Sequence, residues 1–332
     1  MRLPATMKAV VISTYGEAEV LQYTEVPTPT PGAAQVLVEV KAMGLNYLDI
    51  FVRRGMPGRR TPLPHISGGD IAGVVAAVGS EVSTVSVGAR VLVDPAVPEG
   101  AIGEDVPGGM AEYTRVPASN LIPIPDLVSF EEAACLPIAY GTAWRMLITR
   151  ANVRAGETVF ILGASGGVGT AAVQIAKLAG ARVIAGSGSH AKWDRLRHLG
   201  ADDVVDTSDP EFDRSIWALT SKQGVDVLVN YTGAATWIPS IRALKKGGRL
   251  VTCGATAGYQ TLLDLRYVWV RELSLLGSDG WTRQELQTVC LLAWEGKIRP
   301  IIDRILPLAQ AAEAEQALER REVFGKVILV PP

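Results

Sequence analysis

The sequence is poor in the residues that cross-link chains and bind transition metals. Its 332 residues include only 3 Cys and 3 His. These lie far apart, at Cys135, Cys253 and Cys290 and at His65, His190 and His198. A disulfide framework needs a set of regularly spaced cysteines, and a catalytic zinc ion needs three clustered protein ligands. We therefore expect neither a disulfide scaffold nor a metal site.

Charge of one sign and long apolar runs are also missing. The 32 Lys and Arg nearly balance the 34 Asp and Glu, whereas nucleic-acid binding requires a basic surface. The small basic cluster within residues 53–60 is better explained as a solvated loop. The longest apolar run, residues 71–78, is far shorter than the roughly 18 residues of a spanning helix, and residues 1–9 lack a secretory apolar core. We expect a cytoplasmic protein with no nucleic-acid or membrane partner.

Glycine and apolar residues are plentiful, with 34 Gly and 48% hydrophobic residues, enough for two domains. Up to about residue 125, short apolar runs separated by turn residues are typical of a compact β unit. These runs are 9–12, 36–40, 73–78 and 90–93. Two prolines in residues 122–126 then mark the end of the β-type pattern. Ser129 followed by two glutamates predicts the start of a helix.

Beyond residue 158, runs of four to six apolar residues alternate with segments of helical period, which indicates a parallel sheet covered on both faces. These runs are 158–162, 182–185, 225–229 and 249–252. The tail should hold helices near 283–295 and 309–319 and strands at 304–307 and 326–330, and these short strands match the first domain. We therefore predict a β domain from residues 1–127 and 278–332, and an α/β domain from residues 128–277.

A glycine-rich turn follows the first strand of the α/β part. It contains Gly163, Ala164, Ser165, Gly166, Gly167, Val168 and Gly169. A helix of apolar period 168–179 comes next, and then a second strand. Glycines at such a turn let the backbone approach a pyrophosphate, while the helix N-terminus supplies free amides and a positive dipole. The order of strand, turn, helix and strand therefore predicts dinucleotide binding.

Residues 163–167 also match the G-x-S-x-G pattern of a nucleophile elbow, with Ser165 as the nucleophile. A hydrolase would need an acid and then a His further along the chain. No Asp or Glu separates Ser165 from His190, and Asp194 and His198 share one helical turn. A hydrolase is therefore disfavoured.

The second strand bears on the choice of nucleotide. An NAD-specific site places an acid at the end of this strand to bind the ribose hydroxyl groups. Here Ser187 stands in that stretch, with Lys192 nearby and no acid before Asp194. A small hydroxyl and a basic group accommodate a 2′-phosphate, so NADPH is favoured over NADH. The alternative is that Lys192 merely belongs to an exposed helix start.

Motifs along almost the whole chain resemble the medium-chain dehydrogenase/reductase superfamily, in particular its quinone oxidoreductase branch and alcohol dehydrogenases that have lost zinc. They are residues 7–10 (MKAV), 44–49 (GLNYLD), 69–73 (GDIAG), 109–113 (GMAEY), 140–144 (YGTAW), the glycine turn, and 324–327 (FGKV). The resemblance implies an α/β fold class: a Rossmann-type doubly wound parallel sheet beside a GroES-like, mostly β substrate domain. It also implies a homodimer or homotetramer.

Departures from the zinc-binding pattern predict a mechanism without zinc. Asn46, Gly69 and Ala134 stand at the three ligand positions, and residues 95–107 lack the four cysteines of the structural zinc lobe. Cys135 lies one residue from a ligand position, but one thiolate cannot build the site. Without a Lewis acid, hydride transfer to a quinone or α,β-unsaturated carbonyl is favoured, because the developing charge is delocalised. We expect an NADPH-dependent, zinc-independent reductase of such small molecules.

The resemblance also assigns site residues. Asn46 and Tyr47 are candidate hydrogen-bond donors to the carbonyl oxygen, and Thr142 would lie beside the nicotinamide. It remains open that Asn46 only holds a turn and that Tyr47 packs beneath the nicotinamide. Further coenzyme contacts carried over by motif are Asn230, Thr232, Gly254, Ser278 and Lys326.

Other positions depart from related enzymes. Phe51, and Met56 or Pro57, replace tyrosines found in relatives, which weakens an enoyl-CoA reductase assignment, and Thr207 replaces a tyrosine that helps to hold the 2′-phosphate. A zinc-free alcohol dehydrogenase or enoyl reductase, and a non-catalytic NADPH-binding protein, remain the alternatives.

Overall fold

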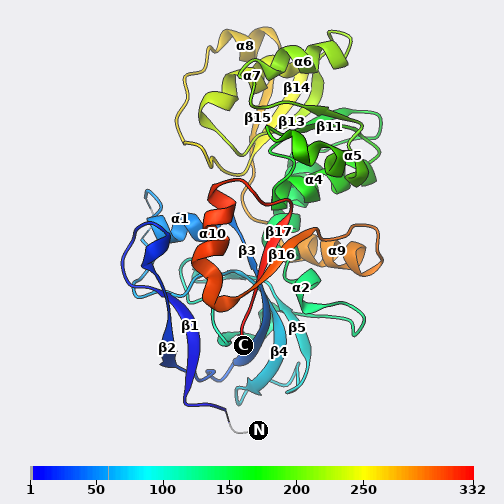
Figure 1. Ribbon diagram of the computed structural model, residues 1–332. Helices are drawn as coiled ribbons and strands as arrows, with labels where there is room; N and C mark the ends of the chain where they lie inside the picture. The colour runs from blue at the N-terminus through cyan, green and yellow to red at the C-terminus, as the bar shows by residue number, and fades with distance from the viewer. Residues whose placement is uncertain (1–2, 59) are drawn as a thin grey trace. The chain divides into compact units, whose positions relative to one another are not determined.

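The computed structural model describes residues 3–58 and 60–332, which form two compact units (Figure 1). The first comprises the described residues up to Ile138, with Leu286–Trp294 and Arg299–Pro332. The second comprises Ala139–Glu285 and Glu295–Ile298. The first boundary falls later than residue 127, because the short helix α2 (Phe130–Ala133) packs on strands of the first unit. Ser129 caps α2, with its hydroxyl accepting a hydrogen bond from the Glu132 amide.

The first unit is mostly β. Its main sheet has the order β16-β17-β3-β4-β5-β9, with β8 paired to β3, and two hairpins, β1-β2 and β6-β7, stand apart from it. The strands are β1 (Thr6–Ile12), β2 (Leu21–Pro27), β3 (Gln35–Leu45), β4 (Asp70–Val78), β5 (Arg90–Val93), β6 (Ala96–Val97), β7 (Gly100–Ala101), β8 (Tyr113–Pro117), β9 (Leu121–Pro123), β16 (Ile302–Pro307) and β17 (Lys326–Val330). Helices α1 (Tyr47–Arg54), α2 and α10 (Ala311–Glu319) belong wholly to it, together with most of α9 (Arg283–Trp294).

Pairing of β17 with β3 brings the end of the chain back to its beginning. The register places Val327 opposite Leu45 and Leu329 opposite Met43, in antiparallel orientation. All four side chains are fully buried in the core of this unit, which also contains Val36, Val38, Ile71 and Val75. The hydrophobic effect on these alternating apolar residues holds the turn after β3 next to the start of β17.

The second unit is a parallel sheet of order β12-β11-β10-β13-β14-β15. Its strands are β10 (Thr158–Leu162), β11 (Arg182–Gly186), β12 (Asp203–Val205), β13 (Val225–Val229), β14 (Leu244–Thr252) and β15 (Ser274–Gly277). Its helices are α3 (Thr142–Trp144), α4 (Gly167–Leu178), α5 (Trp193–Leu199), α6 (Phe212–Leu219), α7 (Trp237–Ala243) and α8 (Arg266–Val270). From β10 the sheet grows first to one side and then to the other, which is the doubly wound Rossmann order.

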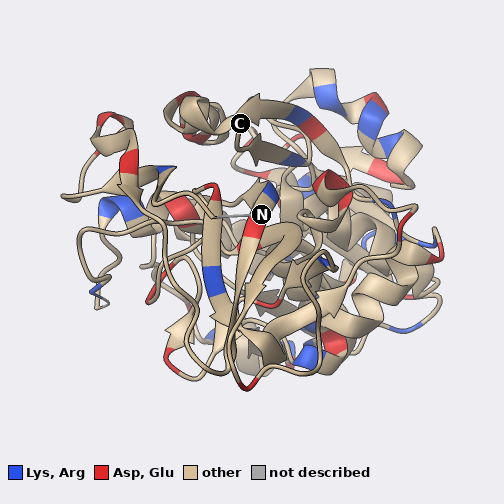
Figure 2. Ribbon diagram, turned by 90° about the horizontal axis from the view of Figure 1, so that it is seen from below, with Lys and Arg blue, Asp and Glu red and all other residues tan. Residues whose placement is uncertain are grey.

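The α/β fold class with a Rossmann-type and a GroES-like part is thus confirmed. Lys, Arg, Asp and Glu alternate along the ribbon without a long stretch of one sign, in keeping with the balanced charge (Figure 2). In the described part of the chain, no helix has the length and apolar character required to cross a bilayer.

Candidate functional site

The glycine turn lies where the order of the parallel sheet reverses. β10 ends at Leu162, its neighbours are β11 and β13, and α4 begins at Gly167. In doubly wound sheets the ligand binds at the carboxyl ends of the strands at this reversal. The geometry therefore places the expected residues 163–169 at the coenzyme end of the sheet.

Two glycines of the turn meet separate steric demands. Gly163 has a φ of +71°, a conformation that side chains disfavour. A Cβ on Gly169 would lie 2.4 Å from the Gly163 carbonyl oxygen, so α4 packs too closely for any other residue. A Cβ on Gly166 would meet only one atom, at 3.7 Å, so the space before it is open. Because the first amides of α4 have no intrahelical acceptor, this open cradle fits a pyrophosphate.

Tyr231 stabilises the turn and was not predicted. Its hydroxyl donates a hydrogen bond of 2.8 Å to the Gly163 carbonyl, and its burial raises the pKa of the phenol far above its usual value. Asn230, one residue earlier, is fully buried and organises the loop after β13. Its Oδ1 accepts hydrogen bonds from the Thr232 and Gly233 amides, at 2.9 and 3.0 Å. Asn230 and Thr232 are thus adjacent to the turn, with Asn230 shaping the loop rather than facing open space.

Two other expected contacts follow the next strands of the same sheet. Gly254 follows β14, where a Cβ would meet no atom within 4 Å. Ser278 follows β15, and its amide donates to the Thr252 carbonyl at 2.8 Å. The Ser278 hydroxyl is buried and makes no hydrogen bond within the described residues. An unpartnered buried hydroxyl is costly, so it is a group that a bound coenzyme could satisfy.

In the region expected to hold the 2′-phosphate, several polar side chains are already bonded to other groups of the protein. Ser187 is only 4% exposed, and its hydroxyl accepts from the Ser189 amide at 3.3 Å. His190 is exposed and pairs with Asp206 at 2.8 Å, and Lys192 is half-buried in the same short turn. Hydrogen bonds from Ser208, followed by that from His190, lower the pKa of Asp206 to about 2, so this acid is ionised.

Asp206 is a missed residue, because it comes from the end of β12 rather than β11. Its only sequence signal was its place just after the two apolar residues Val204 and Val205. A carboxylate bonded to His190 reduces the positive charge available to a phosphate. Asp206 and Ser187 therefore lie together at the ends of the neighbouring strands β12 and β11.

A second group of expected residues lies in the first unit, at the start of α1. The Asn46 side chain donates to the Gly44 carbonyl at 3.0 Å and to Asp70 Oδ2 at 2.9 Å, and its Oδ1 accepts from Lys326 at 2.6 Å. Both amide hydrogens are therefore used within the protein. Tyr47, the next residue, is half-buried, and its hydroxyl makes no hydrogen bond in the described part of the chain. Of the two expected donors, only Tyr47 has a free hydrogen.

Lys326 lies beside Asn46, although the motif assigned it to the coenzyme. Its ammonium group also donates to Asp70 Oδ2 at 2.8 Å. These two bonds use two of its three hydrogens. A single hydrogen therefore remains for any coenzyme contact.

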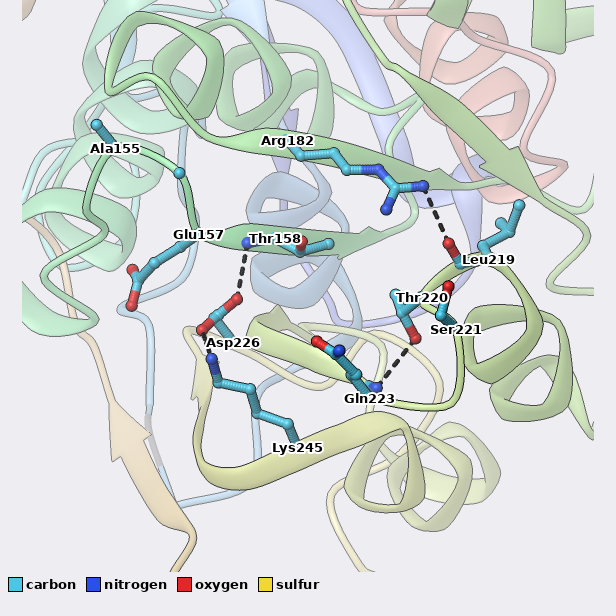
Figure 3. A pocket seen from close by; sticks show the side chains of 12 residues that line it. Ala155, Glu157, Thr158, Arg182, Leu219, Thr220, Ser221, Gln223, Asp226 and Lys245 are labelled. Atoms are coloured by element: carbon cyan, nitrogen blue, oxygen red, sulfur yellow. Dashed lines mark hydrogen bonds and ion pairs between the residues drawn. The ribbon is translucent and has the colours of Figure 1, made fainter.

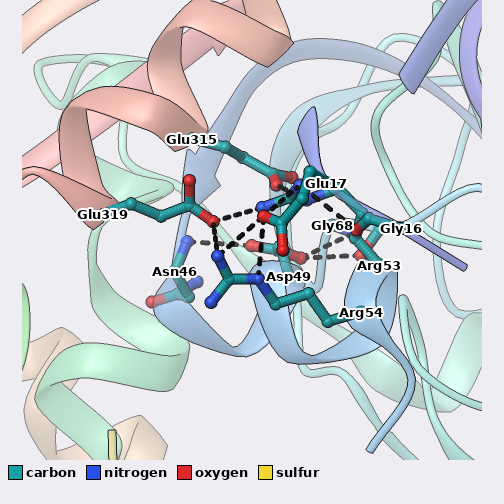
Figure 4. Close-up of polar contacts among 10 residues, drawn as sticks. Gly16, Glu17, Asn46, Asp49, Arg53, Arg54, Gly68, Glu315 and Glu319 are labelled. Carbon is teal, nitrogen blue, oxygen red and sulfur yellow. Dashed lines mark hydrogen bonds and ion pairs between the residues drawn. The ribbon is translucent and has the colours of Figure 1, made fainter. Parts of the chain in front are cut away.

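Buried charged side chains contact both ends of α1 (Figure 4). Asp49 accepts the Asn46 amide at 2.8 Å and the Gly68 amide at 3.0 Å, and its burial raises the pKa of this carboxyl to about 6. At the other end of the helix, the fully buried Arg53 lies 2.6 Å from Glu315 of α10 and also contacts Glu319. The helix that carries Tyr47 is thereby fixed at both ends.

Thr142 belongs to the second unit, where it is buried at the start of α3. Two π-helical segments, Leu136–Gly141 and Arg145–Arg150, flank it, and such segments occur often at functional sites. The Trp281 indole packs on Gly141, where a Cβ would lie 2.8 Å from the ring. Trp281 was not singled out from the sequence, because nothing in its local pattern links it to residue 141.

The residues at the expected zinc positions do not fit a catalytic zinc ion. Asn46, Gly69 and Ala134 offer a single amide oxygen, and that oxygen is bonded to Lys326. Cys135 is buried, which raises the pKa of its thiol to about 12, and its Sγ donates to the Glu131 carbonyl. Among residues 3–58 and 60–332, no three His, Cys, Asp or Glu side chains form a group that could hold a metal.

A polar hollow of about 550 Å³ lies elsewhere in the second unit (Figure 3). It is lined by the amino-terminal ends of β10, β11 and β13, opposite to the glycine turn. Its charged groups are paired: Lys245 with Asp226, and Arg182 with Asp203 at 2.8 Å. Coenzymes of doubly wound sheets bind at the other edge, so this hollow is separate from the candidate site.

Comparison with known proteins agrees with this geometry. Residues 32–126 match the alcohol dehydrogenase GroES-like domain, and residues 167–295 match the zinc-binding dehydrogenase family. The chain is 31% identical to the quinone oxidoreductase of Rattus norvegicus over 98% of both proteins. A crystal structure described as an NAD-dependent alcohol dehydrogenase shares 40% identity, with a TM-score of 0.93 over 98% of this chain and 99% of that one.

A 2-octenoyl-CoA carboxylase reductase, solved with NADP and 2-octenoyl-CoA, is also similar. It shares 31% identity, with a TM-score of 0.90 over 99% of this chain and 88% of that one. The family models together match more than half of the sequence, and the rat relative is similar over almost its full length. The glycine cradle at the reversal of a doubly wound sheet agrees with both. The chain is therefore an oxidoreductase of the medium-chain dehydrogenase/reductase superfamily.

Proposed function

We propose that this protein reduces a quinone or an α,β-unsaturated carbonyl compound with NADPH as the hydride donor and without a metal ion. The observation that carries the proposal is the start of α1, where Asn46 stands at an expected zinc-ligand position and its amide oxygen is already bonded to Lys326. The quinone oxidoreductase relative supports the acceptor class. Without a Lewis acid, an acceptor whose negative charge is delocalised is the easier substrate.

The roles of the residues follow from their contacts. When bound, NADPH supplies the hydride. The turn at Gly163–Gly169 binds the pyrophosphate, and the Ser278 hydroxyl and the Gly254 backbone provide further contacts. Tyr47 donates a hydrogen bond to the acceptor's carbonyl oxygen and stabilises the charge that develops there. Thr142 lines the nicotinamide side.

NADPH is the proposed coenzyme because no acid follows β11, and because Lys192 and His190 lie in the turn after Ser187. The reductase that binds NADP supports this choice. A relative described as NAD-dependent points the other way, and the ionised Asp206 gives a physical reason why NADH could also be used. We expect NADPH to be preferred, but by a modest factor.

The test is steady-state oxidation of NADPH and of NADH at 340 nm with three acceptor classes: ortho- and para-quinones, enones, and 2-enoyl thioesters. An alcohol series with the oxidised coenzymes is run beside them. The proposal expects turnover with quinones or enones, and unchanged rates after dialysis against a chelator. Turnover of alcohols alone, or tight NADPH binding with no turnover of any acceptor, would refute it.

The protein is further proposed to form a homodimer through the second unit. β15 is an edge strand of the six-stranded sheet, and apolar side chains in the segment that precedes it in the sequence are exposed, including Leu262 at 92% and Trp269 at 63%. An unpaired edge strand with an apolar surface favours pairing with another chain. A second copy of this chain carries the same edge strand, β15, and can pair with it. Light scattering should give twice the 35.3 kDa chain mass, and Trp269→Lys should give the monomer. A wild-type monomer at micromolar concentration would refute this.

A further inference from the structure

Lys326 is a charged side chain kept inside the first unit. It is 2% exposed, and its partner Asp70 is fully buried. Lysine is almost never buried at this level unless it is paired. The chain thus keeps a fixed ammonium group at the first residue of β17, directly beside the turn that begins α1.

The contacts of this ammonium group determine how Asn46 is oriented. Asp70 accepts from three donors: Lys326, the Asn46 side-chain amide, and the Ile138 backbone amide at 2.8 Å. If the Asn46 amide were reversed, its NH₂ group would face the ammonium group and its oxygen would face the carboxylate. Both contacts would be repulsive. The ion pair therefore permits one orientation of Asn46.

Asn46 in turn determines where α1 begins. It is the residue before the helix, its backbone amide donates to Asp49 at 2.8 Å, and its side chain holds the Gly44 carbonyl at 3.0 Å. Tyr47 is the next residue and the first of the helix. Release of the Asn46 side chain would remove its bonds to Gly44, Asp70 and Lys326 and so loosen the chain directly before Tyr47. The chain of contacts runs from Lys326 through Asn46 to the Tyr47 backbone.

We propose that Lys326 is a positioning residue, which acts through Asn46 to hold the Tyr47 hydroxyl in its working place. An internal ammonium group thereby supplies the positive charge that the buried Asp70 carboxylate requires, where a chain without Lys326 would need a bound cation. The inference rests on the proposed function, because Tyr47 is the donor in that reaction. It differs from a coenzyme contact, which would act on NADPH affinity.

The first experiment measures kcat, KM for the quinone and the NADPH dissociation constant of Lys326→Met. We expect kcat to fall at least 30-fold while the NADPH dissociation constant stays within about twofold. Lys326→Arg keeps a buried cation and should recover part of the kcat. Lys177→Met is the matched control, because Lys177 also forms a 2.8 Å ion pair, with Asp202, but its side chain is 36% exposed. This variant should leave all three constants unchanged.

A second variant separates positioning from folding. Lys326→Met leaves the Asp70 charge buried without its cation, which can unfold the protein. Lys326→Met/Asp70→Asn removes both charges and should regain thermal stability. The NH₂ group that Asp70→Asn introduces then faces the NH₂ group of Asn46, so Asn46 has to leave its wild-type orientation. We therefore expect the double variant to be folded and to keep the low kcat. A double variant with wild-type kcat would overturn the inference.

A third measurement does not depend on turnover. Tyrosine labelled with ¹³C at Cζ gives a resonance for Tyr47, assigned by its loss in Tyr47→Phe, and this resonance should shift or broaden in the double variant. An unchanged resonance together with unchanged kcat refutes positioning, as does a tenfold weaker NADPH affinity with normal kcat at saturation. If the wild-type protein reduces no acceptor but the resonance moves, positioning is supported and the proposed function fails.

Discussion

Tyr47→Phe removes one oxygen atom from the candidate site and little else. The Tyr47 ring lies edge-on to Phe51, with the ring centroids 5.2 Å apart, and phenylalanine keeps this contact. The hydroxyl makes no hydrogen bond within the described part of the chain. The substitution therefore leaves no buried group without a partner, and we expect a change in the free energy of unfolding within about 0.5 kcal/mol.

The effect on catalysis should be much larger than the effect on stability. Asn46 has no free hydrogen, because its amide is bonded to the Gly44 carbonyl and Asp70. Tyr47 is then the donor that we propose for the developing oxyanion. Loss of one such donor typically costs about 10²–10³ in kcat, or roughly 3–4 kcal/mol of transition-state stabilisation. We expect kcat to fall by this factor, with little change in NADPH affinity.

The assay is stopped-flow reduction of a quinone under single-turnover conditions, so that product release does not mask the chemical step. Tyr23→Phe is the matched control, because Tyr23 is 40% exposed on β2 and its hydroxyl also makes no hydrogen bond. Its rate should equal that of the wild-type protein. A Tyr47→Phe rate within threefold of the wild-type rate would show that the donor lies elsewhere and that the reasoning is wrong.

Three further predictions concern the coenzyme, the metal and pH. Ser187→Asp should shift the coenzyme preference towards NADH, and Asp206→Asn should shift it towards NADPH. The ratio of kcat/KM for NADPH to kcat/KM for NADH tests both variants. Unchanged ratios would show that the phosphate pocket lies elsewhere. Elemental analysis of the purified protein should find less than 0.1 zinc per chain, whereas a stoichiometric amount contradicts the metal-free proposal. Burial raises the pKa of Glu315 from 4.5 to about 8. Between these values the native state binds more protons than the unfolded state, so stability should fall as pH rises, by up to about 1.4 kcal/mol per pH unit. Urea unfolding from pH 5 to 8 measures the slope, which Glu315→Gln should reduce; an identical slope in both proteins would rule out this carboxyl.

Much of the fold could be predicted because the central strands carry a strong local signal. Strands β10, β13 and β17 have the bounds expected from their apolar runs, residues 158–162, 225–229 and 326–330. A strand covered on both faces must be apolar throughout, so it stands out in the sequence. The hairpin strand β2 was missed, because its residues Leu21–Pro27 are mostly exposed and follow no period.

The residues of the candidate site also differ in how far the local sequence predicts them. The glycine turn was visible because its function depends on consecutive residues. The contact between Asn46 and Lys326 joins residues 280 positions apart, and it depends on β17 pairing beside β3. No spacing rule connects such residues, and the motif alone gave Asn46 a free donor that its contacts remove. Asp206 was missed for the same reason, since it reaches the region of Ser187 from the neighbouring strand.

The pairing of β17 with β3 also has a consequence for biosynthesis. Domains generally begin to fold in the order in which they leave the ribosome, but β3 must wait for a strand that is made nearly 300 residues later. Until residues 326–330 emerge, residues 43–45 of β3 lack the strand that pairs with them, and Asp70 lacks the Lys326 cation. A nascent or truncated chain lacking this segment would still contain the whole coenzyme turn and Tyr47. It should therefore bind nucleotide before it can catalyse, so that competence for hydride transfer is acquired last.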